Sequence, residues 1–149
     1  LKRDATELVI RMGTELGVTR FRPIVTERTN THRLNLERLA VIATEAAEQC
    51  ERLDVPDILP PESLRVVLAE WPEDRPLFAA LERRPGERAN VRAAALLIGP
   101  EGGFSETEVE MLRRHGAVHA LSLGPLVLRA ETAVCAGLAR LAAGAEGAA

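Results

Sequence analysis

A continuous apolar run over residues 93–98 ends directly in a glycine-rich turn, and this junction constrains the fold more than any other feature of the sequence. An apolar run of this length without alternation is typical of a strand buried on both faces of a parallel sheet. After the glycines, Ser105 and Glu108 have the spacing of a capping box, which predicts that a helix starts here. The junction therefore predicts a strand, a tight turn and a helix in direct succession, as in α/β proteins.

Helical and strand patterns alternate along the rest of the chain. Helices are expected at residues 5–16, 36–53, from Pro61 onwards, 105–115 and 131–143, and strands at residues 20–25, 55–59, 76–81 and 117–121. The helix at 36–53 is expected to be the longest, and the small residues of its apolar stripe allow another element or another subunit to pack closely. The alternation predicts one α/β domain over residues 1–149, with a mostly parallel sheet and helices on both faces.

Composition excludes several classes of protein. No apolar segment is long enough to span a bilayer, so no membrane association is expected. Cys50 and Cys135 form no Cys-x-x-Cys pair, so we expect two buried, reduced thiols in a cytoplasmic protein and no metal site. The net charge of −3 does not by itself indicate a nucleic-acid-binding protein.

The distribution of the arginines is more informative than the net charge. Five of them lie between residues 20 and 38, against two glutamates in the same interval. Planar guanidinium groups suit phosphate groups and stack on bases. The cluster is either a solvated surface at the start of a helix or an RNA-binding patch. The residues assigned to RNA binding under the second alternative are Arg20, Arg22, Arg28 and Arg33.

Two glycine-rich segments follow predicted strands, and the first covers residues 99–105. Its glycines allow the backbone to approach a ligand closely. A phosphate site is not expected, because no Lys-Ser/Thr pair follows the glycines and Glu101 would repel a phosphate. An adenosine-type ligand with a cationic sulfonium fits this loop better. A purely structural turn between strand and helix is the alternative.

The second segment, residues 121–133, delivers three polar side chains to the start of the last helix. Glu131 and Thr132 are well placed to cap that helix or to favour its positive end, so a structural role explains both. Arg129 has no helical partner in the sequence, which makes it the better functional candidate.

Together, the two segments resemble the RsmE family of ribosomal RNA uridine-N3 methyltransferases, which belongs to the SPOUT superfamily. The resemblance rests on Gly99-Pro100-Glu101-Gly102-Gly103-Phe104-Ser105, followed by Leu123-Gly124-Pro125 and by Leu128-Arg129-x-Glu131-Thr132-Ala133. Upstream segments at residues 14–18 and 45–56 are also similar to family segments, so the likeness spans nearly the whole chain. One position departs from the pattern: Leu126 stands where the family usually has an arginine, so any RNA contact of that arginine would fall to another group.

The resemblance implies a fold, a cofactor and an assembly. The fold would be a SPOUT-type α/β knot, with a deep trefoil knot at the C-terminus that forms the pocket for S-adenosylmethionine. The enzyme would be a homodimer with its active site near the subunit interface. The full-length protein would also carry an N-terminal PUA-like RNA-binding domain that is absent from this chain.

The resemblance also implies which residues bind the methyl donor. We expect contacts from both loops and from the strand at 76–81, made by Ala79, Ala80, Leu97, Ile98, Gly99, Gly102, Gly103, Leu121, Ser122, Leu123, Gly124 and Leu128. Arg129 is expected to stabilise the negative charge that develops on the target base. Glu131 is expected to hold Arg129 in place, with acceptance of the base proton as its alternative role.

The expected function is methylation of N3 of a uridine in 16S ribosomal RNA of the small ribosomal subunit, with S-adenosylmethionine as the donor. One alternative is a SPOUT methyltransferase that acts on another RNA position, such as a ribose 2′-hydroxyl. The other is a non-catalytic RNA-binding or dimerisation module. A nucleotide hydrolase is disfavoured, because the glycine-rich loops contain no phosphate-binding lysine.

Overall fold

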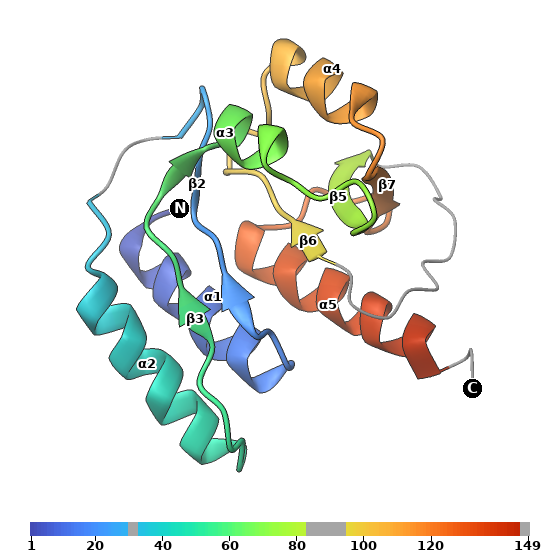
Figure 1. Ribbon diagram of the computed structural model, residues 1–149. Helices are drawn as coiled ribbons and strands as arrows, with labels where there is room; N and C mark the ends of the chain where they lie inside the picture. The colour runs from blue at the N-terminus through green and yellow to red at the C-terminus, as the bar shows by residue number, and fades with distance from the viewer. Residues whose placement is uncertain (30–32, 83–94, 147–149) are drawn as a thin grey trace.

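The computed structural model describes residues 1–29, 33–82 and 95–146 (Figure 1). In chain order the elements are α1 (Arg3–Glu15), β1 (Arg20–Phe21), β2 (Ile24–Val25), α2 (Leu36–Gln49), β3 (Asp57–Ile58), β4 (Glu62–Ser63), α3 (Leu64–Ala69), β5 (Leu77–Glu82), β6 (Ala95–Leu97), α4 (Glu106–Arg114), β7 (Val118–Ser122) and α5 (Ala130–Glu146). Every strand pair among the described residues is parallel. The expected α/β class with parallel pairing is therefore confirmed.

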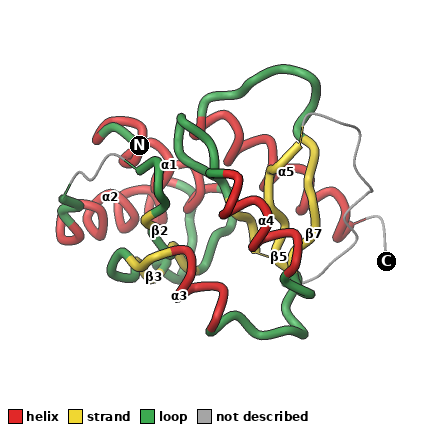
Figure 2. The backbone as a smooth tube through the Cα atoms, turned by 90° about the horizontal axis from the view of Figure 1, so that it is seen from above, coloured by secondary structure: helices red, strands yellow, loops and turns green. Residues whose placement is uncertain are grey.

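The larger sheet has the strand order β6–β5–β7. The chain therefore passes across β5 on its way from β6 to β7, and α4 lies in that crossover. Ala79 of β5 lies opposite Leu97 of β6 and opposite Ala120 of β7. Figure 2 shows β5 and β7 together at one end of the molecule, with α1 and α2 at the other end. Since the strands are parallel, their carboxyl ends share one edge of the sheet.

Helices cover both faces of this sheet, as expected. Leu97 is buried in a cluster with Leu64 of α3 and Leu112 of α4. Successive strand residues point to opposite faces, and Leu96 accordingly lies against α5. The contact is close: a Cβ atom at Gly137 would come within 2.7 Å of Leu96 Cδ2. Glycine at position 137 thus sets how near α5 comes to β6.

The small-residue stripe of α2 packs against a helix of the same chain. Ile42 and Ala43 are buried in a cluster with Ile10 of α1. Figure 1 shows the two helices side by side. α1 also contacts α5, where the Cys135 sulfur lies 3.3 Å from the Met12 sulfur. α1 thus joins α2 to the helix that covers the large sheet.

The segment expected as one strand over residues 20–25 forms two short strands instead. β1 pairs with β3, and β2 pairs with β4. Pro23 lies between them and has no amide hydrogen to donate, so the hydrogen-bond ladder is interrupted at this point.

The helix expected to be the longest ends early. α2 stops at Gln49 rather than at residue 53, and α5, with 17 residues, is the longest helix of the described chain. Glu51 has a φ of 60°, a value that residues of a right-handed α-helix do not adopt. Arg52 then turns back, and its guanidinium donates to the Thr14 carbonyl at 2.7 Å. The same nitrogen donates to the Val18 carbonyl at 2.9 Å, and these two bonds hold the chain in a direction away from the axis of α2.

The expected first turn at Pro61 is also wrong. Glu62 and Ser63 form β4, because Ile24 of β2 lies opposite Glu62 as a parallel partner. α3 begins at Leu64, and the Ser63 hydroxyl caps it by accepting from the Val66 amide at 3.3 Å. Tertiary pairing therefore shifts the helix start past the proline.

The interpretation of both cysteines as buried is wrong for Cys50, which is exposed just beyond α2. Cys135 is partly buried, and both thiols are free. Within the described ranges, no three histidine, cysteine or acidic side chains cluster as metal ligands would. No described helix combines the length and the apolar character that crossing a bilayer requires.

An ion-pair network joins the first two helices. The Glu7 carboxylate accepts from Arg38 of α2 (Nη2 to Oε2, 2.9 Å) and from Arg3 of α1 (Nε to Oε1, 3.0 Å). These hydrogen bonds, of which the one from Arg38 has the larger effect, lower the pKa of Glu7 from 4.5 to about 2. Because the folded-state pKa is lowered, the network stabilises the fold above pH 4.5, and the contribution disappears as the pH falls towards 2.

Replacing Glu7 with glutamine should therefore lower Tm at neutral pH, and the difference from the wild type should shrink as the pH falls below about 4. Thermal unfolding followed by circular dichroism between neutral pH and pH of about 2 measures this. Glu15→Gln, at an exposed glutamate of the same helix, controls for the loss of one negative charge. A Tm difference for Glu7→Gln that stays constant over the whole range would contradict the assignment.

Candidate functional site

The carboxyl ends of β6, β5 and β7 bring together the residues that sequence reasoning placed on three separate strands. Ala79 and Leu97 are opposite each other, and Ser122 is opposite Glu82 near the end of β5. Leu121 and Ser122 are buried at the end of β7. Ala80 follows Ala79 directly on the central strand. The strand-borne part of the predicted site is therefore assembled at one edge of the sheet.

The loop after β6 is shaped by two of its glycines. Gly99 lies against Phe104, and a Cβ atom at position 99 would be 2.9 Å from Phe104 Cε2. Gly103 has a φ of +69°, and its amide donates to the Pro100 carbonyl at 2.8 Å. A side chain at position 99 would thus have to displace Phe104, and one at position 103 is disfavoured by the backbone conformation.

The loop ends at the capping box that the sequence predicts. The Ser105 hydroxyl accepts from the Glu108 amide at 3.1 Å, and the Glu108 carboxylate accepts from the Ser105 amide at 2.9 Å. These reciprocal bonds start α4 at Glu106. The helix therefore anchors the downstream end of the glycine-rich loop.

The loop after β7 also turns on a glycine. Gly124 has a φ of +107°, and its amide donates to the Ser122 hydroxyl at 3.4 Å. Leu126 and Val127 follow, with 75% and 73% of their surface exposed. The guanidinium of Arg140, on α5, donates to the Ser122 carbonyl. Sequence reasoning missed Arg140, and no motif or spacing marks it, because the contact joins a helix to a strand end.

The two loops lead to opposite faces of the sheet. The loop after β6 enters α4, which packs with Leu97, and the loop after β7 enters α5, which packs with Leu96. β6 and β7 flank β5, so the loops diverge on either side of the central strand. In open parallel sheets, such a point of divergence forms a ligand-binding crevice beyond the strand ends.

Main-chain amides are available in both loops. Within the described part of the chain, the Gly124 amide donates a hydrogen bond in segment 123–128 and the Gly103 amide donates one in segment 98–104. Side-chain-poor turns with free amides can bind the polar edge of a planar ligand directly. Glu101 is the one charged residue in these two segments, so both loops offer mainly backbone groups.

Arg129 and Glu131 lie where the second loop becomes α5. Arg129 is exposed, and its carbonyl accepts from the Ala133 amide at 2.8 Å, which makes it the last residue before the helix. Glu131 is partly buried in the first helical turn. Among described residues, neither side chain forms an ion pair, and they do not bond to each other. Both follow the loop after β7, where the chain enters α5.

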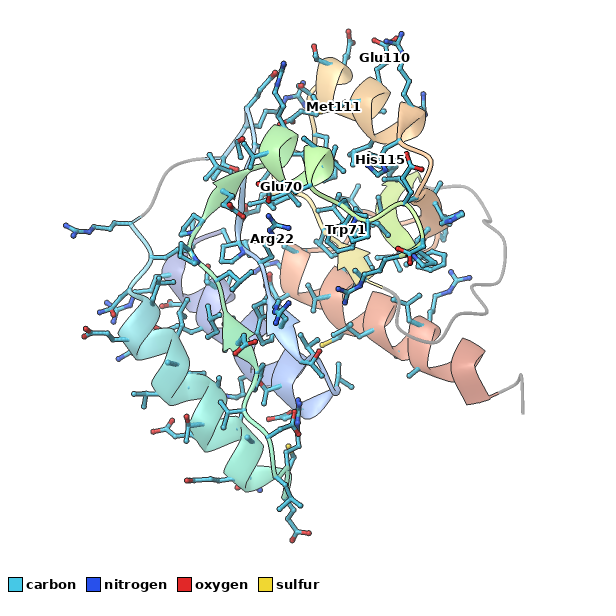
Figure 3. The ribbon with its side chains drawn as sticks, in the orientation of Figure 1. Arg22, Glu70, Trp71, Glu110, Met111 and His115 are labelled. Carbon is cyan, nitrogen blue, oxygen red and sulfur yellow. The ribbon has the colours of Figure 1, made fainter. Side chains whose placement is uncertain are left out.

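The four arginines predicted to bind RNA have different surroundings. Arg20 pairs with Asp57 at 3.1 Å, and Arg33 is exposed. Arg22 donates to Glu62 and to Glu70, as Figure 3 shows for Glu70.

Burial acts to lower the pKa of Arg22, but the hydrogen bonds to Glu62 and Glu70 outweigh it, and the pKa is raised. The Arg22 guanidinium is thus a link between β1–β2 and α3, while Arg28 approaches the first loop and donates to the Gly102 carbonyl at 3.0 Å.

A hollow beside α4 lies apart from the strand ends. Glu110, Met111 and His115 line it, and Figure 3 shows them on and just after α4. His115 is held by the Leu68 carbonyl at 3.0 Å from its Nε2 atom. None of the residues predicted to bind a donor lines this hollow, so it is not the candidate site.

Comparison with known proteins identifies the family of this chain. A family model described as the RNA methyltransferase domain matches residues 1–142. The chain belongs to this family. Ribosomal RNA small subunit methyltransferase E of Rickettsia conorii is 32% identical to this RNA methyltransferase domain, over 95% of the chain and 60% of that protein. The protein of the same name from Bacillus subtilis is 35% identical, over 89% of the chain and 58% of that protein. The resemblance inferred from the two motifs is confirmed.

Solved structures agree. The ribosomal RNA small subunit methyltransferase E of Neisseria gonorrhoeae, bound to S-adenosylmethionine, matches this domain with a TM-score of 0.85 and 31% identity, over 94% of the chain and 61% of that chain. A probable rRNA-methyltransferase from Porphyromonas gingivalis matches with a TM-score of 0.88 and 28% identity, over 99% of the chain and 65% of that chain. This domain therefore spans about three fifths of the length of the relatives from Rickettsia conorii, Bacillus subtilis and Neisseria gonorrhoeae.

Proposed function

We propose that this chain is the donor-binding and catalytic domain of an enzyme that methylates N3 of a uridine in 16S ribosomal RNA, with S-adenosylmethionine as the methyl donor. The observation that carries the proposal is the pair of glycine turns, at Gly103 and Gly124, that follow β6 and β7 at the same sheet edge. The names of the relatives from Rickettsia conorii and Bacillus subtilis, and the donor bound to the Neisseria gonorrhoeae protein, support it.

The residues present fit this donor. Adenine and ribose are planar or compact groups with several hydrogen-bonding atoms, and free amides in segments 98–104 and 123–128 suit them. The proposed contacts come from the loops and the adjoining strand ends, through Ala79, Ala80, Leu97, Ile98, Gly99, Gly102, Gly103, Leu121, Ser122, Leu123, Gly124 and Leu128. Bound there, the donor would supply a methyl group from a sulfonium centre.

The domain's own part in the reaction is alignment and charge stabilisation. In-line methyl transfer depends on the relative position of donor and acceptor, which fixed loops provide. Uracil N3 carries a proton that has to leave, so negative charge develops on the base. Arg129, exposed at the end of the second loop, stabilises that charge and orients the base. Glu131, in the first turn of α5, holds Arg129 when the base is bound or accepts the N3 proton.

The proposal extends to the assembly. It includes a C-terminal trefoil knot, for which the support is the resemblance of the two motifs to the SPOUT superfamily. It includes a homodimer, supported by Leu126 and Val127, which are exposed and apolar beside the proposed site. The proposal also includes RNA contacts of Arg20, Arg22, Arg28 and Arg33. It further includes an N-terminal PUA-like domain in the full-length protein and a cytoplasmic location.

Two measurements test this function. Calorimetry with S-adenosylmethionine should give one donor site per chain. Incubation of the full-length protein with labelled donor and unmethylated small ribosomal subunits, followed by mass mapping of the 16S RNA, should place the label on N3 of a uridine. Label on a ribose 2′-hydroxyl would instead assign the enzyme to another RNA position. Absence of donor binding would reduce the chain to a non-catalytic RNA-binding or dimerisation module.

A further inference from the structure

The Glu108 carboxylate makes a second contact beyond its capping box. Its side chain is buried, with 4% of its surface exposed. Oε2 accepts from the Ser105 amide at 2.9 Å, and Oε1 accepts from the Glu27 amide, also at 2.9 Å. The Glu27 amide belongs to a segment between β2 and α2 and adds nothing to the capping of α4. One buried carboxylate thus joins two separate segments.

The segment that Glu108 reaches is a compact turn over residues 26–29. The Thr29 amide donates to the Thr26 carbonyl at 3.0 Å, which closes a four-residue β-turn. The two threonine hydroxyls are 2.8 Å apart, and the Thr29 hydroxyl accepts from the Thr26 amide. Glu27 and Arg28 are the central residues of this turn. These bonds make the turn a fixed support rather than a loose loop.

The same turn contacts the glycine-rich loop at a second point. The Arg28 guanidinium donates to the Gly102 carbonyl at 3.0 Å. The stem of Arg28 also covers Gly102, because a Cβ atom at position 102 would lie 3.5 Å from Arg28 Cβ. The loop at 99–104 is therefore held from its end by Glu108 and from its middle by Arg28.

We propose that Glu108 and the 26–29 turn are positioning elements that hold the 99–104 loop in the form that binds the methyl donor. This inference rests on the proposed function of that loop. Glu108 acts through the Ser105 and Glu27 amides, and it takes no part in the chemical step. A carboxylate buried between two amides holds them together more strongly than a neutral acceptor does, because the bonds are charge-assisted.

The test breaks the hydrogen bond between the 26–29 turn and Glu108. Glu27 is the second residue of the turn, a position that proline favours. Glu27→Pro therefore keeps the turn and removes the amide hydrogen that is donated to Glu108. Glu27→Ala removes the same side chain and keeps the amide, which makes it the matched control. We expect Glu27→Pro to raise the Kd for S-adenosylmethionine by about five- to tenfold, and Glu27→Ala to leave it within about twofold of the wild type.

A second pair of variants separates positioning from helix capping. Glu108→Gln lacks the charge and one acceptor oxygen, whereas Ser105→Ala loses the serine cap and keeps both carboxylate bonds. Glu108→Gln should weaken donor binding about as much as Glu27→Pro, with kcat at saturating donor unchanged, and Ser105→Ala should lower Tm with little effect on Kd. Equal Kd values for Glu27→Pro and Glu27→Ala would overturn the inference, as would equal Kd values for Glu108→Gln and Ser105→Ala.

Hydrogen exchange tests the inference without the donor. In the wild type, the Gly103 amide is bonded to Pro100, and Glu27→Pro should speed its exchange while Glu27→Ala does not. If the wild type binds no donor but this exchange difference is present, the proposed function fails and the positioning contact stands. If the wild type binds donor and exchange is identical in the two variants, the positioning role fails alone.

Discussion

Replacing Arg129 with alanine is expected to lower kcat for methyl transfer by about 100- to 1,000-fold, the usual cost of removing one group that stabilises a developing charge. The Kd for S-adenosylmethionine should stay within about twofold of the wild type, because the donor is bound by backbone groups of the loops. Single-turnover transfer from labelled donor to small ribosomal subunits measures the first quantity, and calorimetry measures the second.

Two controls define what Arg129 does. Arg65→Ala removes an exposed arginine from α3, away from the strand ends, and should leave kcat unchanged. Glu131→Gln distinguishes the roles of the carboxylate: a holding role predicts a moderate loss of kcat at all pH values, and a proton-accepting role predicts a changed pH profile. Normal turnover by both Arg129→Ala and Glu131→Gln would show that neither belongs to the catalytic site.

Replacing Gly124 with valine is expected to weaken binding of S-adenosylmethionine by about 10- to 100-fold, the equivalent of roughly 1–3 kcal/mol of backbone strain. Gly124 has a φ of +107°, a conformation that a β-branched residue does not adopt without strain, although no atom lies within 4 Å of the position of a Cβ. The loop would therefore change its path rather than clash. Calorimetry on the folded variant, checked by circular dichroism, measures the effect.

Gly116→Val is the matched control for this substitution. Gly116 precedes β7 at the opposite edge of the sheet, and a Cβ there also has no neighbour within 4 Å. Its φ is outside the left-handed region, so valine should be accepted without a change in donor affinity. Equal Kd values for the two valine variants would separate the Gly124 turn from donor binding.

Local patterns were sufficient where neighbouring residues determine the structure. Ser105 and Glu108 indicate the start of α4, and the apolar run before Gly99 indicates β6, because capping and burial depend on residues close in sequence. The break at Pro23 could have been anticipated, since proline donates no ladder bond. The conversion of Glu62 and Ser63 into β4 could not, because it depends on a strand distant in sequence.

The candidate site likewise contains some features that local motifs predict and others that depend on tertiary contacts. The turns at Gly103 and Gly124 follow from local motifs, and the strand order that brings them to one edge follows only from tertiary pairing. Arg140 reaches the Ser122 carbonyl, and Glu108 reaches the Glu27 amide, through contacts that no local spacing encodes. Physical patterns in the chain give no reason to expect a knot, so the expectation of a knot rests on the resemblance of the motifs alone.

The close approach of Gly137 to Leu96 has a consequence for how this domain can evolve. A larger residue at position 137 would meet the Leu96 side chain at 2.7 Å, so it would have to be offset by a smaller one at position 96. The two positions thus form a size-complementary pair. A substitution at only one of the two positions would tilt α5. The tilt would move Arg129, which directly precedes the helix, relative to the carboxyl ends of the strands.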